Sequence, residues 1–186
     1  ILEPISDYGV SKAAATLYCQ ALAKRDKIPI VTLRLFSPYG YFDDSSRLIP
    51  ALILSALKKE SPMLSSPDSV RDYIFIEDVI DAYIRVIENG SKGSGEIFNI
   101  GTGKQYSVRD ITKKIFRLTY FDGTPKWGSK QNPRVESRNW KADISKARKY
   151  LKWLQNNSID LGLEKTISWF KENSFLYLRE KRKKIK

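Results

Sequence analysis

A tyrosine and a lysine four residues apart, Tyr8 and Lys12, are the first residues of this chain that could do chemistry together. Positions four apart share a face of a helix, so the Lys12 ammonium would lie beside the Tyr8 ring. The pKa of a free phenol is about 10. A cation about 5 Å away favours the phenolate by roughly 3 kcal/mol at an effective dielectric constant of 20. The pair could therefore act as a general acid/base that moves a proton to or from a hydroxyl group.

Spacing alone does not identify such a pair, because Tyr177 and Lys181 have the same spacing in a charged C-terminal segment. The surroundings of Tyr8 are different. A helix is predicted from Ser6 or Asp7, both candidate N-caps, to about residue 24. Its apolar stripe consists of Val10, Ala13, Ala14, Leu17, Tyr18 and Ala21.

A β-branched apolar run at residues 30–36 follows this helix and is typical of a buried strand. A helix followed by a buried strand indicates a parallel α/β layer. Ligands of such layers bind at the carboxyl ends of the strands, which here means residues 37–40.

Further helices are predicted at about 47–59, 77–90, 107–118, 143–151 and 161–171, with extended segments at 70–75 and 96–100. Gly101 and Gly103 suggest a dinucleotide-binding loop, but the third glycine of that fingerprint would fall on Tyr106. A tight turn between a strand and a helix is therefore the favoured interpretation.

Composition limits the possible functions. At 186 residues and 41% hydrophobic content, the chain is long enough for one ordinary domain. It has no histidine and only one cysteine, Cys19, which excludes a metal site and histidine-dependent nucleophilic catalysis within this chain. We find no run of 18 apolar residues and no signal-like segment, so we expect a cytoplasmic protein without a membrane partner.

The net charge of +12 is partly concentrated in the basic residues of 179–186. A terminal basic run is more often a solvated end than a nucleic-acid contact, so a nucleic-acid partner is the less favoured interpretation. The chain begins with Ile1 and has one methionine, Met63, which points to a fragment or a processed product.

Six motifs follow one another in a familiar order: YGVSK at 8–12, LRLFSPYG at 33–40, RLIP at 47–50, RDYIFIEDV at 71–79, FNIGTG at 98–103 and ADISKA at 142–147. In this order they resemble the extended short-chain dehydrogenase/reductase family, in particular its NAD-dependent nucleotide-sugar epimerases and dehydratases. The resemblance covers nearly the whole chain and is to the C-terminal half of a member of the UDP-glucose 4-epimerase type. It implies an α/β fold containing the C-terminal part of a Rossmann-type doubly wound parallel sheet, plus a smaller mixed α/β substrate lobe.

The resemblance also implies roles for individual residues. Tyr8 would be the general acid/base at the sugar hydroxyl, and Lys12 would hold the nicotinamide ribose and lower the pKa of Tyr8. Ser37 would contact the substrate where the family usually has asparagine. The other implied substrate-binding residues are Arg47 and Leu48 at the nucleotide and Arg71 and Arg134 at the diphosphate.

Alternatives remain for two of these positions. Arg71 could instead form a salt bridge with Asp72 or Asp78, and Arg138 competes with Arg134 for its role. Asp78 fits a helix cap better than a catalyst.

The family's glycine-rich phosphate loop and its catalytic serine or threonine belong well before Tyr8, and only seven residues precede Tyr8. We therefore expect residues 1–40 to be the remnant of the NAD-binding domain. Residues 41–173 would be mainly the substrate lobe, with some elements returning to the Rossmann sheet, and residues 174–186 a disordered basic tail.

The implied activity is that of a nucleotide-sugar 4-epimerase that uses NAD, with NADP as the alternative cofactor. We expect the isolated chain to be inactive. We also expect a homodimer formed through the Tyr8 helix. A 4,6-dehydratase or a 4-keto reductase is the alternative within the family. A non-catalytic sugar-nucleotide-binding or dimerisation module, or a nucleic-acid binder acting through the tail, is the alternative from another class.

Overall fold

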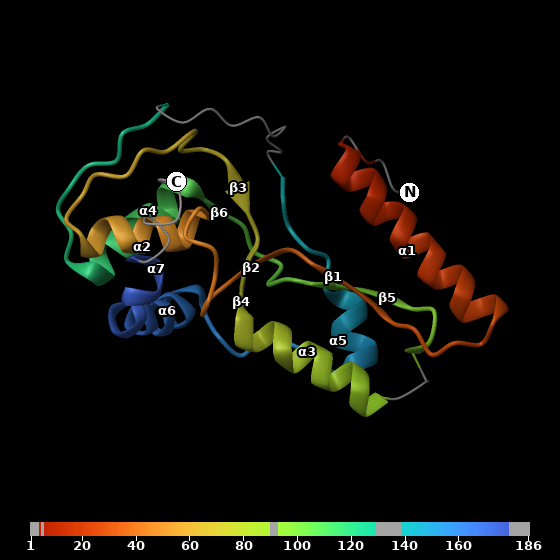
Figure 1. Ribbon diagram of the computed structural model, residues 1–186. Coiled ribbons are helices and arrows are strands. Elements are labelled where there is room, and N and C mark those ends of the chain that lie inside the picture. Colours follow the sequence, from red (N-terminus) through yellow and green to blue (C-terminus); the bar gives the residue numbers. More distant parts are fainter. Residues whose placement is uncertain (1–3, 5, 90–92, 129–138, 179–186) are drawn as a thin grey trace.

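The computed structural model describes residue 4 and residues 6–89, 93–128 and 139–178 (Figure 1). Along these residues the elements are α1 (Asp7–Arg25), β1 (Thr32–Leu35), β2 (Ser37–Tyr39), α2 (Leu48–Leu57), β3 (Val70–Arg71), β4 (Tyr73–Phe75), α3 (Ile76–Asn89), β5 (Ile97–Ile100), β6 (Tyr106–Ser107), α4 (Val108–Thr119), α5 (Ser145–Leu151), α6 (Ile159–Asn173) and α7 (Phe175–Leu178). None of the described helices is long and apolar enough to cross a membrane.

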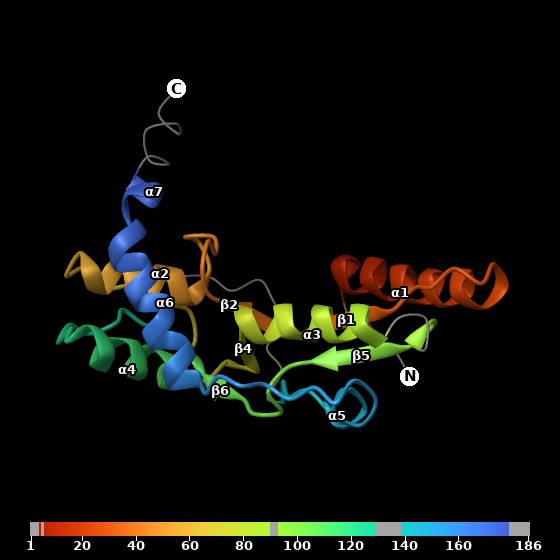
Figure 2. The ribbon, with the colours of Figure 1, turned by 90° about the horizontal axis from the view of Figure 1, so that it is seen from below.

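Strands β1 and β5 form a parallel pair in which Thr32 faces Ile97 and Leu35 faces Ile100. The β1 ladder is shorter than the predicted run of 30–36, yet its backbone pairing continues at both ends. Gly95 donates its N–H to the Ile30 carbonyl, and Phe36 donates to the Ile100 carbonyl. Figure 2 shows α1 and α3 on one side of this pair and α5 on the other, so helices cover both faces.

Asp72 divides the predicted extended segment 70–75 into two short strands with different partners. Strand β3 pairs antiparallel with β6, whereas β4 pairs parallel with β2. The Asp72 carbonyl accepts a hydrogen bond from the Ser37 N–H. The chain thus changes partners at Asp72, beside the start of β2. This residue connects the β3–β6 pair to the β2–β4 pair.

Two clusters of buried side chains form the core. One lies among β2, β4, α2, α4 and α6 and includes Leu52, Phe75, Ile111, Leu163 and Phe170. The other lies among α3, β5 and α5 and includes Val79, Phe98, Ile100, Ala147 and Trp153. In Figure 1 the first cluster corresponds to the group of α2, α4 and α6, and the second to the group of α3, β5 and α5.

Helix α1 begins as predicted, because the Ser6 hydroxyl accepts a hydrogen bond from the Gly9 N–H. Its predicted apolar stripe, however, faces away from the rest of the chain. Val10, Leu17 and Tyr18 are 52%, 58% and 64% exposed. The helix is buried instead at Thr16 and Ala23.

The other helices agree with the sequence pattern to within a few residues. The capping box predicted at Ser107 is present, with Ser107 and Asp110 each accepting from the other's backbone N–H. Helix α5 begins two residues later than predicted, because the Asp143 carboxylate accepts the Ser145 N–H and forms a turn there. Helix α6 begins at Ile159, with the Ser158 hydroxyl as its cap.

Candidate active site

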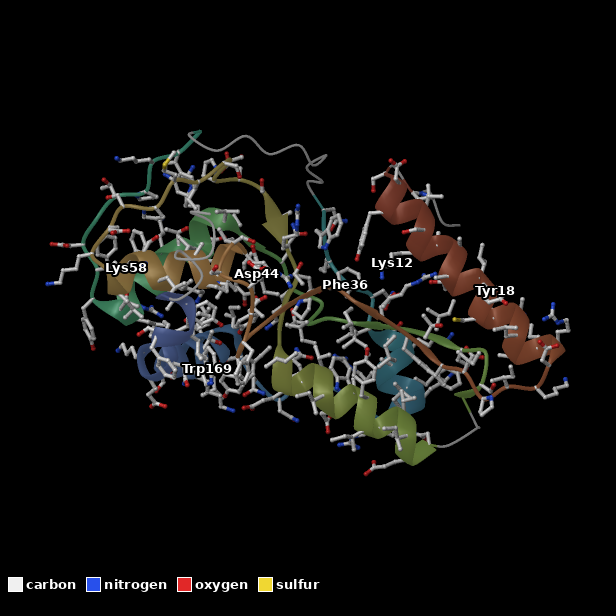
Figure 3. The ribbon with its side chains drawn as sticks, in the orientation of Figure 1. Lys12, Tyr18, Phe36, Asp44, Lys58 and Trp169 are labelled. Carbon is white, nitrogen blue, oxygen red and sulfur yellow. The ribbon has the colours of Figure 1, made fainter. Side chains whose placement is uncertain are left out.

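Tyr8 and Lys12 lie together in the first turns of α1. The Lys12 Nζ atom is 5.5 Å from the centroid of the Tyr8 ring. In Figure 3, Lys12 lies on the side of α1 toward Phe36, which directly follows β1, whereas Tyr18 lies on the far side. The Tyr8 side chain is 73% exposed, so solvent screens its attraction to Lys12 in this chain.

A buried carboxylate organises the edge where β1 and β5 end. Asp72 is fully buried, and its two carboxylate oxygens accept four hydrogen bonds. The donors are Thr102 N (2.8 Å), Thr102 Oγ1 (2.7 Å), Gly103 N (3.0 Å) and Ala142 N (3.0 Å). The glycine turn after β5 is therefore a tight turn, as predicted, and its N–H groups bind a carboxylate of the chain itself.

Arg71 neighbours this carboxylate in sequence but does not pair with it. Its guanidinium carbon is 4.7 Å from the centroid of the Trp140 ring, and its Nη1 donates to the Val70 carbonyl (2.6 Å). Within the described ranges, no carboxylate lies within salt-bridge distance of Arg71. The alternative of an ion pair with Asp72 or Asp78 is therefore wrong.

Asp78 is also engaged elsewhere. Its carboxylate accepts from the backbone N–H of Asn156 (2.7 Å) and from the side-chain amide of Asn157 (3.1 Å), and its carbonyl accepts from the Trp153 indole (3.1 Å). Asp78 thus fastens the segment between α5 and α6 to α3. The prediction that it caps a helix is wrong, because its partners are distant in sequence.

Ser37 begins β2 and pairs in register with Tyr73, one residue beyond Asp72. This places Ser37 at the carboxyl end of β1, as the sequence predicts, and also next to the Arg71–Asp72 segment.

Arg47 and Leu48 lie at the start of α2, in the other group of elements. Arg47 Nη1 is 3.4 Å from Asp43 Oδ1. Burial raises the pKa of Asp43, and the Arg47 charge opposes that rise. Leu48 packs against the α2–α4–α6 core cluster. The interactions found for these two residues do not reach Tyr8 or Arg71.

Arg134 and Arg138 lie outside the described residues. Sequence reasoning missed Asp72, Gln105 and Trp140 as parts of this edge. For Asp72 a signal existed, since aspartate is rare in strands and yet stands within the extended run 70–75. For Trp140 there was none, because its contact with Arg71 joins residues 69 positions apart.

An open hollow of about 390 Å³ lies next to the glycine turn, lined by Gly103, Lys141, Ala142, Asp143, Ile144, Ser145 and Arg148. A hydrogen bond from Ser145 lowers the pKa of Asp143. Among the described residues, none of the site residues predicted from sequence lines this hollow.

Comparison with known proteins bears on this arrangement. The model of the NAD dependent epimerase/dehydratase family matches residues 1–101. Over 173 residues the chain is 30% identical to a trifunctional UDP-glucose 4,6-dehydratase/UDP-4-keto-6-deoxy-D-glucose 3,5-epimerase/UDP-4-keto-L-rhamnose-reductase of Arabidopsis thaliana. That match covers 92% of this chain and 25% of the plant protein.

Two solved structures are similar in fold. The UDP-glucose 4-epimerase of Thermotoga maritima with UDP-glucose has a TM-score of 0.85 and 28% identity, covering 92% of this chain and 55% of that one. The UDP-glucuronic acid 4-epimerase of Bacillus cereus, in complex with UDP-glucuronic acid and NAD, has a TM-score of 0.82 and 29% identity, covering 92% and 54%. The chain thus spans a quarter of the plant relative and a little over half of each solved structure.

The predicted fold class is confirmed by these neighbours, since helices cover both faces of the parallel β1–β5 pair as in a Rossmann-type fold. The family match covers more than half of the 186 residues and includes the Tyr8–Lys12 pair, Ser37 and Arg71. The chain therefore belongs to the NAD dependent epimerase/dehydratase family, within the extended short-chain dehydrogenases/reductases.

Proposed function

We propose that this chain carries the proton-transfer pair and the substrate lobe of a nucleotide-sugar 4-epimerase. The observation that carries the proposal is the placement of the Lys12 ammonium over the Tyr8 ring at the start of α1. In the proposed reaction Tyr8 would take the proton of the sugar 4-hydroxyl and later return it to the oxygen at C4. Bound NAD would supply the hydride chemistry, by accepting the C4 hydride and giving it back to the opposite face of the sugar.

Lys12 has two roles in this proposal. Its charge favours the phenolate of Tyr8 once the site is closed to water, because the same pair of groups interacts more strongly at low dielectric. Its ammonium would also hold the ribose of a bound nicotinamide nucleotide.

For the substrate, we propose that Arg71 binds the diphosphate and that Ser37 donates one hydrogen bond nearby. A guanidinium presents two parallel N–H groups to a phosphate, a geometry that a lysine does not offer. Arg47 and Leu48 would line the nucleotide, and Arg134 would add a second contact to the diphosphate.

The cofactor proposed is NAD, with NADP as the alternative. Its diphosphate would be held by a segment with the pattern G-x-x-G-x-x-G, which the 186 residues do not contain. We therefore infer that these 186 residues alone show no turnover. We also propose that the exposed Val10, Leu17 and Tyr18 face of α1 packs against the same helix of a second copy.

A 4,6-dehydratase is the second candidate, because the Arabidopsis relative includes that activity in its name. The two reactions share the initial oxidation at C4 and differ in their later steps. A dehydratase eliminates water from C5 and C6, which needs a further acid and base.

The test has two stages. First, UDP-glucose binding to the purified chain is measured by calorimetry for the unaltered chain, for Arg71→Ala and for a variant lacking residues 179–186. We expect Arg71→Ala to lose most of the affinity and the shortened chain to keep it. Loss of binding only on removal of the tail would contradict the proposed site.

Second, NAD and the separately produced nucleotide-binding half of the Thermotoga maritima epimerase are added, and the products are separated by chromatography. UDP-galactose supports the epimerase, and UDP-4-keto-6-deoxyglucose supports the dehydratase. Turnover by the 186 residues alone would contradict the inference that they are incomplete.

A further inference from the structure

Two backbone hydrogen bonds, one from Trp140 itself and one from Ala142, hold the segment that carries the Trp140 side chain. The Trp140 N–H donates to Gln105 Oε1 (2.9 Å). Two residues later, the Ala142 N–H donates to the buried Asp72 carboxylate (3.0 Å). Gln105 itself directly precedes Tyr106, the residue that pairs with Arg71 in the β3–β6 ladder. The backbone that carries the indole is thus held next to β6, the strand that pairs with Arg71.

The contact between the two side chains is a cation–π contact, with the guanidinium carbon 4.7 Å from the ring centroid. A guanidinium that stacks its flat face on a ring uses none of its five N–H donors in that contact. The hydrogen bond to the Val70 carbonyl uses one donor from Nη1. Trp140 and the Val70 carbonyl thus hold the guanidinium, and the described residues leave most of its N–H groups for an anion.

A carboxylate partner would have the opposite effect, because it would occupy the N–H edge and neutralise the charge. The carboxylate closest in sequence, Asp72, takes four hydrogen bonds from Thr102, Gly103 and Ala142. It is fully buried and committed to those donors. Arg71 thus forms no ion pair with the acidic residue that follows it, because the Asp72 carboxylate has other partners.

We propose that Trp140 is the positioning residue for Arg71, and that its ring orients the guanidinium for a two-point contact with the diphosphate of a nucleoside diphosphate. This proposal rests on the diphosphate-binding role proposed above for Arg71. It adds that the affinity for the diphosphate depends on an aromatic ring at position 140, which itself does not touch the phosphates.

The experiment compares the affinity of the purified chain for UDP and for uridine, which lacks the diphosphate, by calorimetry. We expect Trp140→Ala and Trp140→Leu to weaken UDP binding by about 3- to 10-fold, the range of an exposed to partly buried cation–π contact, and to leave uridine binding unchanged. Trp140→Phe should stay within about 2-fold of the unaltered chain, because it restores an aromatic face.

The chain offers a matched control in a second arginine–tryptophan contact. Arg109 lies over the Trp127 ring, with 5.8 Å from its guanidinium carbon to the centroid, and Arg109 is also within 3.4 Å of Asp68. Trp127→Ala removes the same kind of side chain away from the β1–β5 edge. It should leave the affinity for UDP unchanged.

A double-mutant cycle separates positioning from a general structural effect. In an Arg71→Ala background, Trp140→Ala should have no further effect on UDP affinity, since there is no guanidinium left to orient. Equal weakening of UDP and uridine binding by Trp140→Ala, or a full effect of Trp140→Ala without Arg71, would overturn the proposal.

The outcomes also distinguish this proposal from the function on which it rests. If Arg71→Ala weakens UDP binding while Trp140→Ala and Trp140→Leu do not, the positioning role is wrong and the diphosphate site stands. If the unaltered chain does not bind UDP, or Arg71→Ala leaves its affinity unchanged, the diphosphate site itself is wrong.

Discussion

Asp72 concentrates four hydrogen bonds on one buried carboxylate, and those bonds join the glycine turn after β5 to the segment that carries Trp140. All four donors are neutral N–H or O–H groups. A carboxylate can accept this many hydrogen bonds because it presents two oxygens with about four lone-pair sites and no hydrogen.

Replacing Asp72 by asparagine should therefore be strongly destabilising. The new amide would turn an NH₂ group toward backbone N–H donors and leave at least one of them without an acceptor. We expect a loss of about 2–4 kcal/mol in the free energy of unfolding, measured by urea denaturation. Asp68→Asn is the matched control, because the Asp68 side chain is 80% exposed, and it should stay within about 0.5 kcal/mol. Equal stabilities of the two variants would contradict the role given to Asp72.

Tyr8 carries the proposed chemistry, so its replacement should change turnover, whereas replacement of Asp72 changes stability. In the assay with the added nucleotide-binding half, Tyr8→Phe should lower turnover by about 10²- to 10⁴-fold, the usual contribution of a general acid/base. Tyr18→Phe on the outer side of the same helix should keep full turnover, since Tyr18 is 64% exposed and away from Lys12. A Tyr8→Phe variant with normal turnover would mean that another group transfers the proton.

At the scale of elements, Gly162 lets α6 approach β2 and β4 closely. A Cβ atom at this position would collide with the Tyr39 hydroxyl and would lie 3.1 Å from the Phe75 Cβ atom. Both neighbours are nearly fully buried and have little room to move. The close packing of α6 therefore explains why position 162 is a glycine, since its backbone has an ordinary helical conformation.

Gly162→Ala sets two effects against each other. Alanine is favoured over glycine inside a helix by about 1 kcal/mol, whereas overpacking in a filled core costs about 1–3 kcal/mol. We expect a net loss of stability in urea denaturation. Tyr39→Phe removes the colliding hydroxyl at the cost of a long hydrogen bond to the Ile159 carbonyl (3.4 Å). The double variant should therefore lose less than the sum of the two single variants, and simple additivity would contradict the collision.

Helix α1 is the least supported long element of the described chain. It is buried only at Thr16 and Ala23, and Gln20 provides its side-chain hydrogen bond to the Gly95 carbonyl. Helix α4, by contrast, buries Val108, Ile111, Thr112 and Ile115. Local opening costs less where fewer apolar contacts are lost.

Amide hydrogen exchange should therefore be faster in residues 7–25 than in residues 108–119, when measured on the isolated chain by mass spectrometry. Addition of the separate nucleotide-binding half should slow exchange in α1 and leave α4 unchanged, if that half covers the helix. Protection of α1 equal to that of α4 in the isolated chain would contradict this prediction.

The sequence predicted most elements correctly where periodicity and capping act locally. The Ser6 cap, the capping box at Ser107 and the β1 strand follow directly from side-chain types. The burial of α1 could not be predicted in this way. An apolar stripe shows which face of a helix is suited to contact, but not whether the partner belongs to the same 186 residues.

In the candidate site, too, local relations could be predicted from the sequence and long-range contacts could not. The proximity of Tyr8 to Lys12 is a local relation and follows from helical spacing. The contacts of Arg71 could not be predicted, because its ring partner Trp140 is far away in sequence. The donors that occupy Asp72, such as Ala142, are equally distant. The division of the chain into lobes at residue 40 stays a prediction.

At the scale of the whole molecule, two buried tyrosines make the free energy of unfolding fall at alkaline pH. Burial raises the pKa of Tyr73 to about 12, and the nearby Arg71 charge opposes that rise. Burial also raises the pKa of Tyr39 far above its usual value. In the unfolded chain both phenols ionise near pH 10. The stabilisation is thus complete below about pH 10 and falls as the pH rises toward 12, because the unfolded state loses its protons first.

Tyr73→Phe should therefore show a shallower loss of stability between pH 9 and pH 11 than the unaltered chain. The free energy of unfolding by urea at both pH values measures the difference. Tyr120→Phe is the control, since Tyr120 is 94% exposed and should leave the slope unchanged. Parallel slopes for all three proteins would show that Tyr73 ionises equally in the folded and unfolded states.

Strand β4 belongs to both core clusters at once. Tyr73 and Phe75 point into the cluster with α2, α4 and α6, while Ile74 between them points into the cluster with α3, β5 and α5. Successive side chains of a strand point to opposite faces, so three residues are enough to contribute to both clusters. A hinge motion at β4 would therefore expose buried side chains of one of the two clusters. The two cores should therefore melt in a single cooperative transition, and any closure over a substrate must bend the chain elsewhere.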